Sequence, residues 1–131
     1  MKPWDRRALW IGGLVAACLW SCAARGTELP RDSRDAAVFR GALVFGNYCV
    51  TCHGIHADGN GRAARLYKPK PANLRLSDKN DAYVALIVRL GGEALGRSPF
   101  MPPWGAELTD EQMRDLVVYV RSLNERADPA R

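Results

Sequence analysis

The sequence predicts an all-α domain, with three to four helices and no strand. Apolar side chains recur at helical spacing in two stretches, residues 35–49 and 113–123. Thr109 and Gln112 precede the second stretch at the spacing of a capping box, in which each side chain satisfies a backbone N–H of the other residue. No segment shows the strict alternation of polar and apolar residues that a half-buried strand would require.

The first helix of the domain is predicted to begin near Asp35. Val38, Ala42 and Phe45 recur at i, i+4 and i+7, which places them on one helical face. This helix runs into a pair of closely spaced cysteines. A loop containing several glycines and prolines then follows over residues 54–76.

Two further helices are predicted after this loop. One begins at Ser77 or Asp78, both favourable N-cap residues, and ends at about Leu90 because Gly91 and Gly92 follow it. Residues 93–108 contain three prolines and are predicted to form a loop. The last helix carries acidic residues in its first turn. It shows one apolar stripe: Met113, Leu116, Val117, Val120 and Leu123.

The first 22 residues have the pattern of an export signal. Lys2, Arg6 and Arg7 precede an uncharged apolar run over residues 8–20. A run of about a dozen residues is too short to cross about 30 Å of hydrocarbon comfortably, although an uncleaved anchor helix is the alternative. The predicted organisation, in residue numbers, is an export signal with a lipidation motif at 1–22, a polar tether at 23–34 and one domain at 35–131.

Two cysteines near the end of the signal predict a lipid anchor. Residues 15–17 precede Cys18 with the Val-Ala-Ala pattern of a bacterial lipobox. Residues 19–21 precede Cys22 with the preferred leucine, but a bulky tryptophan stands where a small residue is usual. Either cysteine is a candidate, and the alternative is a secreted protein cleaved near residues 23–24 without lipid. Lipidation would tether the domain to a membrane on the periplasmic side.

The charge balance favours protein or membrane partners over nucleic acid. The chain carries +5, and residues 1–22 contribute a net +2 from three bases and one acid, which leaves +3 for the remainder. An excess this mild is weak evidence for nucleic-acid binding. Five cations with no acid among them predict either a docking surface for an acidic redox partner or a solvated face: Arg62, Arg65, Lys68, Lys70 and Arg75.

Cys49, Cys52 and His53 form the C-x-x-C-H pattern of covalent haem c attachment. Cysteines at i and i+3 lie on one side of a helical turn, so each thiol can reach one vinyl group of the same haem. His53 follows directly and can present its imidazole to the iron as an axial ligand. The alternatives are a zinc site completed by His56, whose ligands would all come from eight consecutive residues, and a thiol-redox pair or plain disulfide.

Met101 is the candidate for the second axial ligand of the iron. It lies in the proline-rich segment 98–104, where prolines can hold a sulfur in place without a helix. Met113 is the alternative, but it lies on the apolar stripe of the last helix, where packing is the expected role. His56 follows His53 on the same side of the haem and is expected to be a solvent-exposed loop residue.

Residues 35–123 resemble the class I cytochrome c family. The resemblance rests on Gly41 and Phe45 before the C-x-x-C-H pattern, on the Met-Pro-Pro-Trp sequence that begins at Met101, and on Tyr119 in the last helix. The family implies an all-helical shell around one covalently bound, low-spin haem. It also implies that the first and last helices cross closely, with the small residue at Gly41 permitting the contact.

The resemblance further implies roles for residues around the haem. In the family a proline carbonyl accepts the ring N–H of the axial histidine, and both Pro69 and Pro71 are candidates. Tyr67 and Trp104 are candidates to line the haem or contact its propionates, with ordinary core or rim packing as the alternative.

The implied function is that of a one-electron carrier between redox proteins, in which electrons pass at the exposed haem edge. His53 and Met101 would fill both axial positions of the iron, which leaves no site for a substrate and argues against enzymatic activity. The alternative is a cytochrome subunit bound permanently in an oxidase or dehydrogenase complex. A haem peroxidase or gas-binding protein is a more remote alternative, because it would require an absent or labile distal ligand.

Overall fold

The computed structural model describes residues 29–127, and within this range all regular structure is helical, as predicted. The elements are α2 (Arg34–Tyr48), α3 (Val50–His53), η1 (Ala64–Leu66), η2 (Leu74–Leu76), α4 (Asp81–Leu90), η3 (Glu93–Leu95) and α5 (Asp110–Ala127), where η denotes a 3₁₀ turn. The predicted export signal and the candidate lipidation sites Cys18 and Cys22 lie outside the described residues. None of the described helices is long and apolar enough to span a bilayer.

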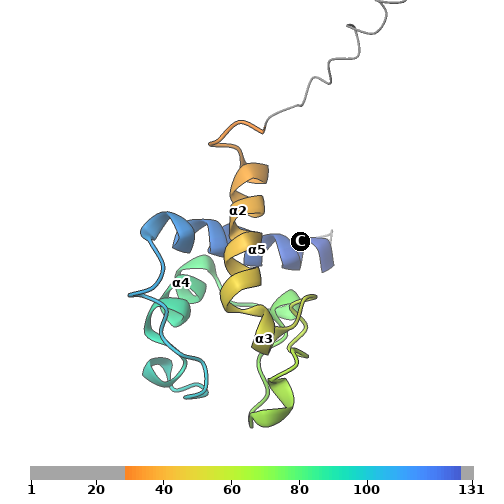
Figure 1. Ribbon diagram of the computed structural model, residues 1–131, viewed down its shortest axis with the longest axis vertical. Coiled ribbons are helices and arrows are strands. Elements are labelled where there is room, and N and C mark those ends of the chain that lie inside the picture. The colour runs from red at the N-terminus through yellow and green to blue at the C-terminus, as the bar shows by residue number, and fades with distance from the viewer. Residues whose placement is uncertain (1–28, 128–131) are drawn as a thin grey trace, which may run out of the picture.

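The helices α2 and α5 cross in direct contact (Figure 1). The contact point is Gly41, where a Cβ atom would lie 2.0 Å from the carbonyl oxygen of Asp115 and 2.7 Å from the Cβ of Tyr119. Neither distance is possible between real atoms, so the crossing requires a residue without a side chain. The role that the resemblance implies for Gly41 is therefore confirmed.

An ion pair joins the two helices beside this contact. Arg40 of α2 donates from Nε to Oδ2 of Asp115 at 2.6 Å and from Nη2 to Oδ1 at 3.0 Å. Asp115 is only 6% exposed, so its charge would be costly without a partner. The two-pronged geometry also restricts the angle at which the helices meet.

The hydrophobic core lies where α5 meets α2 and α4. Phe45 and Leu116 are its largest fully buried side chains, and the ring of Phe45 lies 5.3 Å from that of Tyr119 between centroids. The predicted apolar stripe of α5 is confirmed, because all five of its members are buried: Met113, Leu116, Val117, Val120 and Leu123.

Two predicted helix ends are confirmed by their hydrogen bonds and backbone angles. Oγ1 of Thr109 accepts from the N–H of Gln112 at 3.2 Å, and Oε1 of Gln112 accepts from the N–H of Thr109 at 2.9 Å, which is the expected capping box. Gly91 ends α4 with a φ of +80°, a left-handed value that glycine adopts without strain.

The predicted start of α4 at Ser77 or Asp78 is wrong. The helix begins at Asp81, and Asn80 is its N-cap because Oδ1 of Asn80 accepts from a first-turn N–H at 2.9 Å. Ser77 has an extended backbone, and its carbonyl oxygen accepts from Nδ2 of Asn124 on α5 at 2.6 Å. The side chain of Ser77 accepts from the N–H of Lys79 at 3.3 Å, so Ser77 belongs to a turn before the helix, and Asn80 sets the helix start.

We expect Gly41→Ala to destabilise the protein by about 1–3 kcal/mol, the usual cost of overpacking a closely packed site. Gly46 provides a matched control in the same helix, because it is exposed and a Cβ atom there meets nothing within 4 Å. Gly46→Ala should stabilise the protein by about 0.5–1 kcal/mol, since alanine is favoured over glycine inside a helix. Denaturant unfolding followed by circular dichroism measures both changes, and equal changes would contradict the packing account.

Candidate functional site

The residues of the C-x-x-C-H pattern form one helical turn at the end of α2. Cys49 closes α2 by donating its N–H to the carbonyl of Phe45 at 2.9 Å, and its own carbonyl accepts from the N–H of His53 at 2.8 Å. Cys52 follows within the same turn, and both cysteines are partly buried free thiols. The turn therefore brings two thiols and one imidazole together.

Burial, reinforced by the nearby Cys52, raises the pKa of the Cys49 thiol to about 12. The thiol therefore stays protonated at neutral pH. A thiol-redox centre needs a thiolate as its nucleophile, which requires a lowered pKa. The environment of Cys49 thus disfavours the thiol-redox alternative.

The ring of His53 is oriented by a backbone hydrogen bond. Its Nδ1 lies 3.0 Å from the carbonyl oxygen of Ala72, which can only accept, so Nδ1 carries the proton and donates it. Nε2 is then left unprotonated, with a lone pair for a metal. Burial lowers the pKa of His53 although the bond to Ala72 opposes this change. The neutral imidazole, the form that binds metals, is therefore favoured.

The predicted acceptor of this bond, the carbonyl of Pro69 or Pro71, is wrong. The oxygen of Pro71 faces Gly59 instead, where a Cβ atom would lie only 2.4 Å from it. The carbonyl within hydrogen-bond distance of His53 is the next one along the chain, that of Ala72. A backbone acceptor leaves no trace in the side-chain pattern, which is why the sequence did not reveal it.

The loop after the cysteine turn is bonded to the carbonyl groups of that turn. The amides of Gly59 and Gly61 donate to the carbonyls of His53 and Cys52, at 2.9 and 3.1 Å. These carbonyls would otherwise be unpaired at the end of a helix. The glycines were visible in the sequence, but nothing there showed which groups they approach. His56 lies exposed on this loop, as predicted.

Met101 belongs to the segment that follows η3, and this segment lies beside α4 (Figure 1). It is partly buried and packs against the core together with Trp104. The Trp104 ring contacts the Tyr48 ring at the end of α2, with centroids 5.1 Å apart. The Met101 segment is therefore attached to both α2 and the core.

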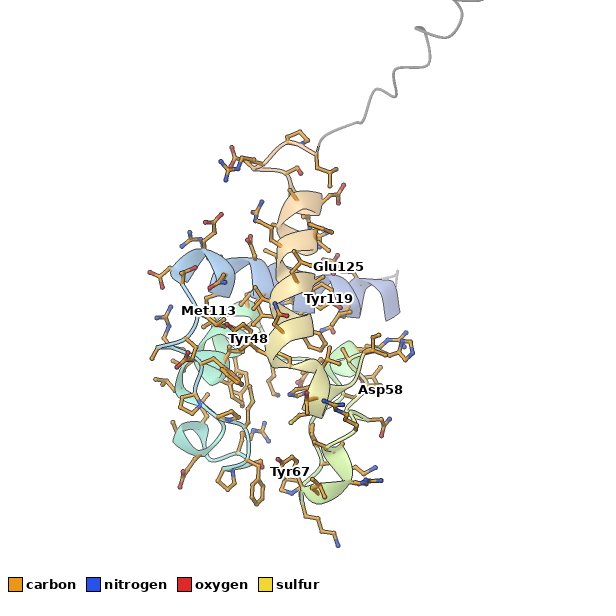
Figure 2. All side chains as sticks on the ribbon, in the orientation of Figure 1. Tyr48, Asp58, Tyr67, Met113, Tyr119 and Glu125 are labelled. Atoms are coloured by element: carbon orange, nitrogen blue, oxygen red, sulfur yellow. The ribbon has the colours of Figure 1, made fainter. Side chains whose placement is uncertain are left out.

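A second aromatic contact connects the same segment to the loop after the cysteine turn. The ring of Phe100, next to Met101, lies 5.0 Å from the ring of Tyr67. Figure 2 shows Tyr67 at the end of the view away from α5, whereas Met113 lies on α5. Met113 is only 3% exposed and belongs to the core, in agreement with the packing role expected for it.

Comparison with known proteins identifies the family. Residues 36–120 match the model of the family described as cytochrome c oxidase, cbb3-type, subunit III. The chain belongs to this family and is a c-type cytochrome. A chain of the Kuenenia stuttgartiensis reducing HAO-like protein complex has a similar structure, with a TM-score of 0.60 and 28% identity over 79% of this cytochrome and 48% of that chain. The all-α cytochrome c fold predicted from the sequence is confirmed.

The cytochrome is also similar to curated subunits of one oxidase type. The Cbb3-type cytochrome c oxidase subunit FixP of Bradyrhizobium sp. (strain ORS 278) is 34% identical over 97 residues, 71% of this cytochrome and 29% of the relative. The subunit CcoP of the same oxidase type from Azospirillum brasilense is 28% identical over 114 residues, 85% of this cytochrome and 35% of the relative. The cytochrome therefore spans about one third of the length of these relatives.

The side chains of the site fit a haem c group. A c-type cytochrome holds its haem through the cysteines of a C-x-x-C-H motif, and here both thiols are free and share one turn with His53. The ring of His53 has one nitrogen engaged and one available. Partly buried apolar side chains pack against the core on both sides of the site: Tyr48, Val50, Leu74, Val84, Ile87, Met101 and Trp104.

Proposed function

We propose that this cytochrome transfers single electrons between redox proteins through one covalent, low-spin haem c, as a subunit held in an oxidase-type complex. Cys49 and Cys52 form the thioethers, and His53 and Met101 are the axial ligands. The observation that carries the proposal is the His53 ring, which lies on the cysteine turn with Nδ1 bonded to Ala72 and Nε2 left for iron. The 131 residues contain one C-x-x-C-H motif, which supports one haem on this chain.

The haem supplies a one-electron iron couple when it is bound. The cysteine turn keeps the group attached, Ala72 fixes the orientation of His53, and the core-packed side chains exclude water. A thioether ligand such as that of Met101 raises the reduction potential. With His53 and Met101 on the iron there is no position for a substrate, so the proposal includes no enzymatic activity of the chain itself.

The comparisons favour a bound subunit over the freely diffusing carrier that the sequence placed first. The curated relatives are named as subunits of a cbb3-type oxidase, and the similar solved chain comes from a protein complex. The domain matched by the family model covers residues 36–120, which include the whole cysteine turn and the Met101 segment. We therefore propose that the donor and the acceptor meet this cytochrome within a larger assembly.

The N-terminal segment supports a place for the domain on the periplasmic face of a membrane. We propose that residues 1–22 direct export and that Cys18 or Cys22 is lipidated, with residues 23–34 as a tether. In the described part of the chain, α2 begins at Arg34, the last residue of the proposed tether, and Ser33 caps it by accepting from a first-turn N–H at 3.2 Å.

A basic surface on the loop after the cysteine turn supports an acidic partner. The ion pairs between described residues involve none of its five cations, and all five are exposed: Arg62, Arg65, Lys68, Lys70 and Arg75. Leu66 and Leu76 lie among them in sequence and are 71% and 75% exposed. Unpaired cations around exposed apolar side chains are suited to docking an acidic protein face.

We expect Met101→Ala to abolish the weak far-red charge-transfer band of methionine-ligated ferric haem and to lower the reduction potential, because the thioether is lost. Met113→Ala is the control: it should lower stability by about 2–5 kcal/mol through the cavity it leaves, while the band remains. Loss of the band in Met113→Ala alone would transfer the ligand role to Met113. Release of haem from the wild-type chain on a denaturing gel would contradict covalent attachment.

Purification of the full chain from native membranes tests the proposed setting. The cytochrome should co-purify with other redox subunits, and mass spectrometry should show a lipid-modified cysteine at its mature N-terminus. Cys18→Ala and Cys22→Ala identify which cysteine carries the lipid. A soluble, unmodified protein without partners would support the freely diffusing carrier and contradict the bound subunit.

Reaction with small charged oxidants tests the basic surface. Oxidation of the reduced protein by ferricyanide should slow as salt is added, because charges are screened over about 8 Å at physiological ionic strength. At low salt, Lys68→Glu combined with Lys70→Glu should oxidise more slowly than the wild type. The control, Arg31→Glu combined with Arg114→Glu, makes the same change in net charge at two exposed arginines outside this loop that form none of the ion pairs between described residues. Equal effects of the two double variants would show that only net charge matters.

A further inference from the structure

The end of α4 is bonded closely to the segment that contains Met101. The N–H of Gly92 donates to the carbonyl of Met101 at 2.9 Å, and the carbonyl of Gly92 accepts from the N–H of Arg97 at 2.8 Å. The backbone of Gly92 thus holds Met101 through its N–H and Arg97 through its carbonyl.

The space at Gly92 is filled by the same segment. A Cβ atom there would lie 2.1 Å from the carbonyl oxygen of Ser98 and 3.3 Å from the Cβ of Met101. Gly92 has φ −70° and ψ −38°, angles that any residue adopts. The requirement for glycine at this position therefore comes from the close approach of residues 98–101 and not from backbone strain.

A second anchor follows Met101 along the chain. The amides of Trp104 and Gly105 donate to the carbonyls of Val88 and Arg89 at 2.9 and 3.1 Å. These are carbonyls of the last turn of α4, which lack partners within the helix. A Cβ atom at Gly105 would lie 2.8 Å from the carbonyl oxygen of Arg89, so this contact is also too close for a side chain.

The two prolines between these anchors cannot hold Met101 in place by backbone bonds of their own. Pro102 and Pro103 have no N–H to donate. Met101 itself makes one local bond, from its N–H to the carbonyl of Ser98 at 3.3 Å. The bonds that attach its segment to α4 come from Gly92 on one side and from Trp104 and Gly105 on the other.

We infer that Gly92 and Gly105 are positioning residues that set the place of the Met101 sulfur by clamping its segment onto the end of α4. The inference rests on the proposed ligation of the iron by Met101. It assigns the strength of that ligation to backbone contacts between the Met101 segment and the end of α4.

The test is Gly92→Ala in the full-length holoprotein. The added methyl group should displace Ser98 and Met101, so the far-red band of the ferric protein should fall by more than about half and the potential should decrease. Imidazole should bind the ferric iron about tenfold more tightly, as expected for a misfit that loosens the native ligand. The helical circular dichroism should remain that of the wild type.

Gly96→Ala is the matched control in the same loop. Gly96 has a φ of +65°, so alanine is strained there, but a Cβ atom meets nothing within 4 Å. This variant should lose stability yet keep the band, the potential and the imidazole affinity of the wild type. If Gly92 had only a structural role, Gly92→Ala and Gly96→Ala would give the same band, potential and imidazole affinity. That result would overturn the inference.

The outcomes of Met101→Ala and Gly92→Ala together distinguish a failure of this inference from a failure of the proposed function. If Met101→Ala loses the band while Gly92→Ala keeps it, the positioning role is wrong and the ligation stands. If Met101→Ala keeps the band of the wild type, both are wrong. Should Gly92→Ala yield no holoprotein, Gly105→Ala tests the second anchor with the same readouts. If Gly105→Ala keeps the band, potential and imidazole affinity of the wild type, the proposed clamping of the Met101 segment is wrong.

Discussion

The contact between α2 and α5 at Gly41 determines where the rest of the molecule lies. Because the carbonyl of Asp115 occupies the space of a side chain there, the two helices meet at one defined place. The pair between Arg40 and the Asp115 carboxylate then restricts their angle. The cysteine turn is the direct continuation of α2, so the position of His53 follows from this crossing. The contact at Gly41 and the ion pair beside it thus place the turn that carries Cys49, Cys52 and His53.

The other half of the site depends on a longer chain of contacts. Met101 is fixed to α4, and α4 is joined to α5 by apolar packing around Val88 and by two ion pairs, Arg89 with Asp110 and Arg121 with Asp81. These pairs are exposed and contribute little to stability. The position of α4, and with it that of the Met101 segment, therefore rests mainly on apolar packing. His53 lies on a turn that directly continues α2, whereas Met101 depends on two successive contacts, that of its segment with α4 and that of α4 with α5.

This difference explains how much the sequence could predict. The cysteine turn, the stripe of α5 and the capping box at Thr109 depend on residues close in sequence, and each was predicted from spacing alone. The role of Gly41 came only from the resemblance, because its contact lies across the molecule. The start of α4 was misplaced because Ser77, Asp78 and Asn80 are all favourable N-cap residues, and the structure shows Asn80 in that role. The acceptor for His53 is the backbone carbonyl of Ala72, which no side-chain pattern in the sequence marks.

Small size gives covalent attachment a structural purpose in the proposed holoprotein. The loop after the cysteine turn leaves Ile55, Leu66 and Leu76 at least 71% exposed, and it is held mainly by hydrogen bonds to the carbonyls of the turn. A domain of this size buries too little apolar surface to enclose a large planar group completely. A haem that is bonded to Cys49 and Cys52 stays in place without full enclosure, so its edge can remain open for electron transfer.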